Sequence, residues 1–287
     1  MSSTKDYLNL HFVVFLWGFT AILGKLITIP AVEMVFYRTL LSAIGMGALM
    51  LVRKDIFTVS GNDLTKLFLT GLVVGAHWLT FFLAVKISNP STALVGFATC
   101  SLWAALLEPL VKKRRIQVVE VFLGVVVIVG LYIIFSFDFQ YPSGLFLGIL
   151  SGVTVAIFGV INSLMVRRIS STTITFYEMI SACLSIGVFM MFANDELHLK
   201  PSPLDWLWIS ILALVCTVYA YAIAIELMKR LSVFFIQLSL NLEPVYGIIL
   251  ALLIFGKNEV MDWSFYLGTV IILAAVLLYP VLKSAPR

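Results

Sequence analysis

Two ionisable side chains, Glu243 and His77, lie in the middle of long apolar runs of the sequence. At about 1.5 Å per residue, Glu243 lies about 15 Å into a helix that begins near Val233, at the centre of a hydrocarbon layer about 30 Å thick. His77 lies at a similar depth, because Lys66 and Lys86 bracket it almost evenly. Ionisable groups at this depth are costly and mark substrate or proton pathways. Both side chains can bind a charged ligand or exchange protons with it.

Aromatic side chains that carry a hydrogen-bonding group lie at the same depth in other apolar runs, below the level of an interfacial aromatic belt. Their rings can stack on a ligand or hold an ammonium group, and their N–H and O–H groups can bind it. In one run both Tyr219 and Tyr221 lie near the middle, and helical spacing puts Tyr246 on the face of Glu243. The predicted substrate-binding residues are Trp17, His77, Trp78, Trp103, Tyr219, Glu243 and Tyr246.

These residues need a membrane to position them. The chain has 287 residues, of which 61% are hydrophobic and 12% charged, and its mean hydropathy is +1.07. A soluble domain would carry roughly a quarter charged residues, so we expect an all-α integral membrane protein. The predicted spans of about 20 residues each are 10–29, 32–52, 64–85, 92–111, 118–135, 144–166, 173–193, 204–228, 233–255 and 263–282.

The basic residues predict the orientation of the ten spans. Most of the 19 Lys and Arg residues lie in the N-terminal segment and in every second connection, as the positive-inside rule requires of cytoplasmic segments. Both termini are therefore predicted to be cytoplasmic. The basic residues form no patch with interleaved aromatic residues, so a nucleic-acid partner is not expected.

An internal repeat divides the chain. The segments MVFYRTLLSAIGMG and TITFYEMISACLSIG align with their Phe-Tyr pairs in register, which places Arg38 opposite Glu178. Residues 1–140 and 141–287 then hold five spans each, and an odd number of spans gives the halves opposite topology, as in secondary transporters. Inversion puts Arg38 in the outer half of the membrane and Glu178 in the inner half. We expect these two residues and Lys25 to be pathway charges near the mouths of a central cavity.

Pro244 is the predicted hinge of the ninth span. It has no N–H group, so the carbonyl of Leu240 loses its usual partner and the helix bends there. A freed carbonyl needs a protein or water partner in the membrane. The interior face beside Glu243 is therefore expected to line a cavity.

The sequence contains no recognisable catalytic or metal-binding motif. The cysteines lie far apart without metal-ligand spacing, and neither a zinc-helix His pair nor a nucleophile elbow occurs. We expect no metal, no cofactor and no catalytic residue. Glu108, four residues before Lys112, is expected to be interfacial and paired with the KKRR cluster.

The order of spans and motifs resembles the drug/metabolite transporter superfamily, specifically its EamA branch. WGFTAILGKL in the first span, FYRTLLSA in the second and EPVYGIILALLIFGKNE in the ninth carry the resemblance, which covers nearly the whole chain. It implies a bacterial inner-membrane transporter that exports amino acids or related metabolites by alternating access. GAHWLTFFLA, with His77 and Trp78, is similar to the cavity lining of aromatic amino-acid exporters. The first half lacks a counterpart of Pro244, since Leu102 aligns there.

Three functions remain as alternatives. The first is secondary transport of a small, partly apolar metabolite, coupled to protons that His77 or Glu243 exchanges. The second is a membrane enzyme that acts on a lipid-linked substrate, with the same two residues as acid and base. The third is a non-transporting membrane subunit.

Overall fold

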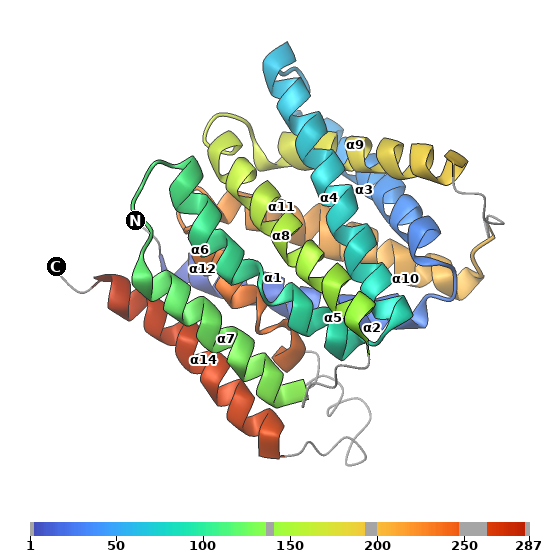
Figure 1. Ribbon diagram of the computed structural model, residues 1–287. Coiled ribbons are helices and arrows are strands. Elements are labelled where there is room, and N and C mark those ends of the chain that lie inside the picture. The colour runs from blue at the N-terminus through green and yellow to red at the C-terminus, as the bar shows by residue number, and fades with distance from the viewer. Residues whose placement is uncertain (1–2, 136–140, 193–199, 247–262, 285–287) are drawn as a thin grey trace.

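Helices dominate the computed structural model, which describes residues 3–135, 141–192, 200–246 and 263–284, apart from the side chains of residues 21, 25, 90, 91, 135 and 284. No strand occurs within these ranges. The helices are α1 (Thr4–Gly18), α2 (Thr20–Leu26), α3 (Ala31–Arg53), α4 (Gly61–Ile87), α5 (Pro90–Phe97), α6 (Cys100–Val111), α7 (Val118–Phe135), α8 (Pro142–Met165), α9 (Ser171–Phe192), α10 (Pro203–Ala213), the π-helix Leu214–Tyr219, α11 (Ala220–Leu227), α12 (Val233–Leu240) and α14 (Trp263–Ser284) (Figure 1).

Eight of the ten predicted spans correspond to segments that are long and apolar enough to cross a membrane. The protein is therefore a multi-pass membrane protein. The predicted span 118–135 forms α7, whose apolar stretch Val118–Ile134 is shorter than the others. The predicted span 233–255 begins with α12, but residues 247–255 lie outside the described ranges. The number ten therefore stays a prediction.

Polar caps fix where several spans begin. At α10, the Ser202 hydroxyl accepts a hydrogen bond from Asp205 N, and the Asp205 carboxylate accepts one from Ser202 N in return. Such a capping box satisfies amide groups that have no partner within the helix. Asp205 also accepts hydrogen bonds from the N–H and hydroxyl groups of Thr28, at 2.7 and 2.8 Å. This contact fastens the chain after α2 to the start of α10.

Three of the spans are interrupted near their middle. The first breaks at Phe19 between α1 and α2, and the fourth breaks at Ala98 and Thr99 between α5 and α6. In the ninth, α12 ends at Leu240, residues 241–242 form a turn and residues 243–246 are helical again. The break lies just before Pro244, which therefore sits in a first helical turn, where its missing N–H group costs little.

Polar side chains at these breaks donate additional hydrogen bonds to carbonyl groups near the helix ends. Thr20 Oγ1 donates to the carbonyl of Trp17 at 2.7 Å, and Thr99 Oγ1 donates to the carbonyl of Gly96 at 2.8 Å. Asn241 Nδ2 lies 3.2 Å from the Gln237 carbonyl. Polar side chains at the breaks make interrupted helices tolerable at membrane depth.

Helices α3 and α9 pack against each other through reciprocal contacts. A Cβ atom on Gly47 would lie 3.0 Å from Phe176 Cε2, and a Cβ atom on Gly187 would lie 3.2 Å from Phe36 Cε2. Phe36 and Phe176 occupy the same position of the two similar segments, and so do Gly47 and Gly187. Each phenylalanine ring thus fills the space above the other helix's glycine.

The same reciprocity recurs elsewhere. Between α7 and α14, which lie side by side in Figure 1, Gly130 packs against Ile272 and Gly268 packs against Ile134. Contacts in which residue i meets j and j meets i are typical of elements related by a two-fold axis.

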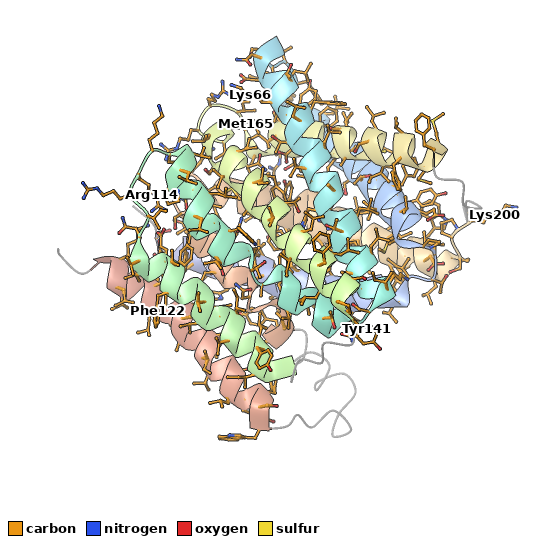
Figure 2. The ribbon with its side chains drawn as sticks, viewed as in Figure 1. Lys66, Arg114, Phe122, Tyr141, Met165 and Lys200 are labelled. Atoms are coloured by element: carbon orange, nitrogen blue, oxygen red, sulfur yellow. The ribbon has the colours of Figure 1, made fainter. Side chains whose placement is uncertain are left out.

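The labelled residues show which helix ends lie together. Lys66 and Arg114 lie toward one end, and Tyr141 and Lys200 lie toward the opposite end (Figure 2). Tyr7, near the start of α1, and Lys283, near the end of α14, line one small cavity together. The first and last described helices therefore reach the same side of the molecule.

Candidate functional site

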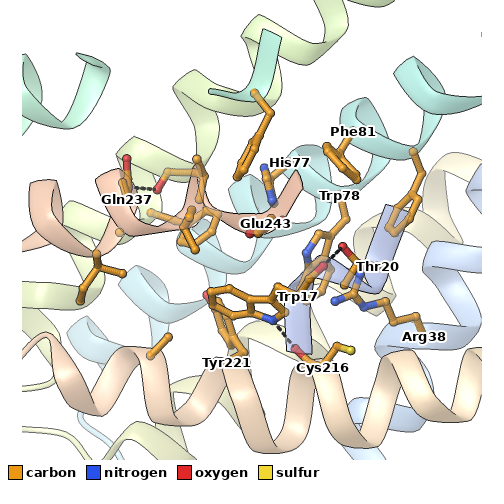
Figure 3. A pocket seen from close by; sticks show the side chains of 18 of the residues that line it. Trp17, Thr20, Arg38, His77, Trp78, Phe81, Cys216, Tyr221, Gln237 and Glu243 are labelled. Atoms are coloured by element: carbon orange, nitrogen blue, oxygen red, sulfur yellow. Dashed lines mark hydrogen bonds between the residues drawn. The ribbon is translucent and has the colours of Figure 1, made fainter. Parts of the chain in front are cut away.

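A buried cavity lies where the interrupted helices α1, α2 and α12 meet α3, α4, α8 and α11 (Figure 3). Its volume is ≈ 80 Å³, as space open to the centres of water molecules, which is room for several waters at about 10–15 Å³ each. Seven aromatic residues line it: Trp17, Trp78, Phe81, Phe82, Phe97, Phe158 and Tyr221. Its polar and charged lining residues are Thr20, Arg38, His77, Gln237 and Glu243.

Arg38 brings a positive charge to this cavity. The side chain is buried, its Nε donates to Thr217 Oγ1 at 3.0 Å, and its guanidinium carbon lies 4.1 Å from the centre of the Trp78 ring. A guanidinium group stacked on an aromatic face keeps the hydrogen atoms at its edge available for a carboxylate. Arg38 therefore lies at the cavity itself and not at an outer mouth.

Glu243 brings a carboxyl group to the same cavity. It is buried, it lies in the short helical segment after the break in the ninth span, and it points into the space that Arg38 and His77 also line (Figure 3). Two opposite charges in a low-dielectric site stabilise each other. A ligand that carries both charges can bind between them without leaving either one unpaired.

His77 is held in place by α8. Its Nδ1 lies 2.9 Å from Ser151 Oγ and 3.0 Å from the Ser151 carbonyl oxygen. Its ring contacts the rings of Phe97 and Phe158, with centroids 5.8 and 5.4 Å away. The Ser151 contacts fix the orientation of the imidazole, which leaves it able to bind a ligand but not to turn freely.

Trp17 lies at the end of α1 and closes one side of the cavity. Its Nε1 donates to the carbonyl of Cys216 at 2.8 Å. Cys216 belongs to the π-helix Leu214–Tyr219, and Thr217 Oγ1 donates to the Leu212 carbonyl at 2.9 Å. π-Helical turns have carbonyl groups out of register with the α-helical pattern and often occur at functional sites. Here one such carbonyl anchors a tryptophan of the cavity wall.

The structure brings Trp17, Arg38, His77, Trp78 and Glu243 together in the cavity. Three other predicted binding residues lie elsewhere. Trp103 Nε1 donates to Thr99 Oγ1 at 3.1 Å, Tyr219 is about half exposed and packs its edge against Phe12, and the Tyr246 hydroxyl lies 3.0 Å from His11 Nδ1. The side chain of Lys25 lies outside the described part of the structure.

Glu178 lies behind the cavity wall. It is fully buried and accepts hydrogen bonds from Asn162 and Tyr221, so it is not at a mouth of the pathway. The Tyr221 ring, in contrast, lines the cavity and contacts Trp78 edge-on at a centroid distance of 6.1 Å. Tyr221 and Tyr219 have similar predicted depths in the same span, but depth does not tell which of the two side chains faces the cavity.

Gln237 is a cavity residue that sequence reasoning missed. Its Nε2 donates to the carbonyl of Val155 at 2.9 Å, and its Oε1 is buried with no hydrogen-bond partner among the described residues. The signal that could have identified it is an amide side chain within an apolar run, four residues before Asn241. Asn241 lies at the break that follows α12. An unpartnered amide oxygen at a cavity can accept a hydrogen bond from an ammonium or amide ligand.

Glu108 lies away from the cavity, at the end of the molecule where the predicted inner loops gather. It forms ion pairs with Lys112 at 2.8 Å and with Arg114 at 3.4 Å, as its position before the KKRR cluster predicts. Its carboxylate also accepts a hydrogen bond from Phe234 N at 3.1 Å, so it caps α12. Burial alone would lower the pKa of the Arg114 guanidinium. The hydrogen bond from Arg114 to Glu120 and the negative charges of Glu120 and Glu108 have a larger effect, so the pKa is raised above its usual value.

Metal-binding geometry is absent from the described ranges, where no group of three or more His, Cys, Asp or Glu side chains could hold an ion. The groups that line the cavity can bind a ligand by charge, hydrogen bonding and aromatic stacking. These groups belong to residues on both halves of the chain.

Comparison with known proteins adds a family. The model of the EamA-like transporter family matches residues 5–136 and again residues 142–279. A relative described as an uncharacterized transporter from Archaeoglobus fulgidus is 25% identical over 289 residues, which is 96% of this chain and 97% of the relative. A solved structure described as "Crystal structure of protein" superposes with a TM-score of 0.82 at 16% identity, covering 99% of this chain and all of that one. The last likeness concerns the fold alone.

Proposed function

The chain belongs to the EamA-like transporter family, and we propose that it exports amino acids or closely related metabolites by alternating access. Family membership and the similarity to a protein described as a transporter establish the broader statement that it is a membrane transporter of a small molecule. Substrate class and mechanism are our proposal, and the observations below support them.

The observation that carries the proposal is the combination of Arg38 and Glu243 in one aromatic cavity. An amino acid is a zwitterion, so its carboxylate can bind the guanidinium group while its ammonium group binds the carboxylate of Glu243. An apolar or aromatic side chain fits the remaining wall, where Trp78 and Phe158 lie. A purely cationic or anionic ligand would satisfy only one of the two charges, and the other would bear an uncompensated desolvation cost.

The size of the cavity and its interrupted helices support alternating access. At ≈ 80 Å³ the cavity holds water but leaves little space for a ligand, so the surrounding helices must separate to admit a substrate. The breaks at Phe19 and after Leu240 lie beside the cavity and divide their spans into segments that can move separately.

The reciprocal contacts support two inverted repeats of residues 1–140 and 141–287. Phe36 and Phe176 exchange equivalent contacts with the glycines of the opposite helix, and the family model matches twice, on either side of residue 140. In an inverted pair, the two halves can exchange conformations to open the cavity to either side. We also propose that the membrane is the bacterial inner membrane with both termini in the cytoplasm, on the strength of the Lys and Arg bias.

Ligand-induced thermal stabilisation of the purified protein tests this proposal, because a ligand that binds only the folded state raises the unfolding temperature. L-Tryptophan, tryptamine and indole-3-propionate share one ring but carry both charges, only the ammonium or only the carboxylate. We expect L-tryptophan to stabilise the protein most, and Glu243→Gln to remove this advantage. Equal stabilisation by all three compounds would show that the cavity does not select a zwitterion.

A further inference from the structure

A second group of polar side chains is buried directly behind the cavity wall. Glu178 on α9, Asn162 on α8 and Tyr221 on α11 form a closed cluster, in which Glu178 and Asn162 are 0% exposed. Tyr221 OH donates to Glu178 Oε2 at 2.8 Å, and Asn162 Nδ2 lies 3.3 Å from the same oxygen and 3.1 Å from the Tyr221 hydroxyl. Both hydrogen bonds that the Glu178 side chain accepts therefore end on the same carboxyl oxygen, Oε2.

The other oxygen of Glu178 has no partner. Glu178 Oε1 and the neighbouring Asn162 Oδ1 are both buried acceptors without a hydrogen bond among the described residues. No Lys or Arg in the described ranges forms an ion pair with Glu178. An ionised carboxyl group would thus keep a charged oxygen unpaired in an apolar interior, which costs several kcal/mol more than any net gain from its two hydrogen bonds.

The elements packed against α9 supply no compensating charge at this level. On α4, the uncharged Gly71 approaches the Glu178 backbone, which a Cβ atom added at Gly71 would meet. On α3, Arg38 instead bonds Thr217, and on α4, His77 bonds Ser151. Tyr221 on α11 is the titratable side chain that contacts Glu178 within the described structure.

We propose that Glu178 is a proton-binding site of the transport cycle, protonated in this conformation and deprotonated when the cluster opens to water. The part that Glu178 plays in transport rests on the proposed function, whereas its binding and release of a proton do not. In the step, the O–H bond at Glu178 Oε1 breaks, the proton passes to water, and the carboxylate is left hydrated. The reverse step takes a proton from water on the other side of the membrane, so no further reactant is needed.

Tyr221 connects this site to the cavity. Its hydroxyl bonds Glu178, while its ring forms part of the cavity wall and touches Trp78 and Phe158. A substrate that displaces the ring must also disturb the hydrogen bonds of Glu178. Substrate occupancy and protonation are thereby coupled through one side chain, with proton and substrate moving in opposite directions for an exporter.

Glu243 and His77 are less suited to this task than the sequence indicates. Glu243 shares its cavity with the guanidinium group of Arg38, a cation that favours the ionised form of a carboxyl group and that Glu178 lacks among the described residues. His77 Nδ1 is already engaged with Ser151. Glu178 has neither a cation nor a second hydrogen-bonded oxygen, which leaves a proton as the simplest means of neutralising it.

Infrared spectroscopy of the purified protein without substrate tests the site directly, because a protonated carboxyl group has its own C=O band. We expect a band that disappears as the pH rises and that is absent from Glu178→Gln. The matched control Glu120→Gln alters a buried carboxylate that pairs with Arg114 at 2.9 Å, and it should retain the band. A band unchanged in Glu178→Gln, or one removed by sodium at constant pH, would overturn the proposal.

A second variant serves if Glu178→Gln does not fold. Tyr221→Phe keeps the ring in the cavity wall but removes a donor to Glu178 Oε2, which favours the neutral form. The band should then persist to higher pH than in the wild type, and an unshifted titration would contradict the assignment.

Transport separates this inference from the proposed function. In proteoliposomes, exchange of one proton for one substrate drives about tenfold accumulation of L-tryptophan per unit of pH gradient, on the acidic side. Glu178→Gln should abolish this accumulation and retain tryptophan exchange at zero gradient. Loss of exchange in the wild type would contradict the proposed function alone, whereas gradient-driven accumulation in Glu178→Gln would contradict the proton site.

Discussion

The guanidinium carbon of Arg38 lies 4.1 Å from the centre of the Trp78 ring. The two residues come from neighbouring helices, α3 and α4, and both line the central cavity. The ring face supports the planar guanidinium group, and the hydrogen bond to Thr217 fixes its rotation. Together they present a positive charge of defined orientation to a ligand.

Arg38→Lys should therefore weaken binding although it keeps the charge. Lysine cannot stack as a plane or bind a carboxylate through two parallel hydrogen bonds. We expect the apparent affinity for L-tryptophan in exchange assays to fall by about tenfold, the size of one charge-assisted hydrogen bond of about 1.5–3 kcal/mol. Arg53→Lys, at the exposed end of the same helix, is the control and should leave the affinity unchanged. An equal effect of both substitutions would argue against a role for Arg38 in binding.

Trp17 and Trp103 have similar predicted depths but different places in the structure. Trp17 lines the cavity and bonds Cys216, whereas Trp103 bonds Thr99 within its own span. Trp17→Phe removes the N–H group that bonds the Cys216 carbonyl, so the aromatic ring at this side of the cavity is no longer held in place. We therefore expect the tryptophan exchange rate to fall severalfold. Trp103→Phe should change the exchange rate little. The reverse order of effects would mean that the cavity described here is not the binding site.

Gly71 sits where α4 approaches α9 most closely. A Cβ atom there would lie 2.5 Å from Ser181 Cβ and 2.7 Å from the Glu178 carbonyl oxygen. Gly71→Ala should destabilise the protein by about 1–3 kcal/mol, as overpacking does, and lower its unfolding temperature. Gly61→Ala meets nothing within 4 Å at the start of the same helix, so helix propensity should make it neutral or slightly stabilising. A Gly71→Ala protein as stable as the wild type would mean that the two helices are not in this contact.

Glu108 joins α6 to the start of α12. Glu108→Gln removes the charge that pairs with Lys112 and Arg114, and we expect a loss of about 1.5–3 kcal/mol in stability, measured as a lower unfolding temperature. Glu226→Gln breaks an ion pair with Lys229 in which both side chains are more than a third exposed. That change should cost less than about 1 kcal/mol. Similar costs for the two substitutions would show that Glu108 is not a buried anchor.

Sequence reasoning predicts a depth for each site residue, because depth follows from counting residues along a span. The direction in which each side chain points is harder to predict, because it depends on how every helix is rotated. Tyr219 and Tyr221 illustrate the reason: residues two apart on a helix lie about 200° apart around its axis, so only one of them faces the cavity. The π-helix Leu214–Tyr219 changes the register that decides which one it is, and in the structure it is Tyr221.

Tyr246 also shows that the direction of a side chain is harder to predict than its position along a span. It lies three residues after Glu243, which leaves it about 60° away around the helix axis. In the structure this rotation is enough to turn its ring toward Phe15 and its hydroxyl toward His11 on α1. The breaks in the first and fourth spans were also beyond prediction, because Thr20 and Thr99 stabilise them through contacts that only the folded chain reveals.

Exchange of radiolabelled L-tryptophan across proteoliposomes tests the central claim most directly. We predict exchange well above that of protein-free vesicles for the wild type, competition by other amino acids, and a loss of at least about tenfold in Glu243→Gln, which removes the charge that binds the ammonium group. No exchange of any amino acid by a folded wild-type protein, or undiminished exchange in Glu243→Gln, would contradict the account.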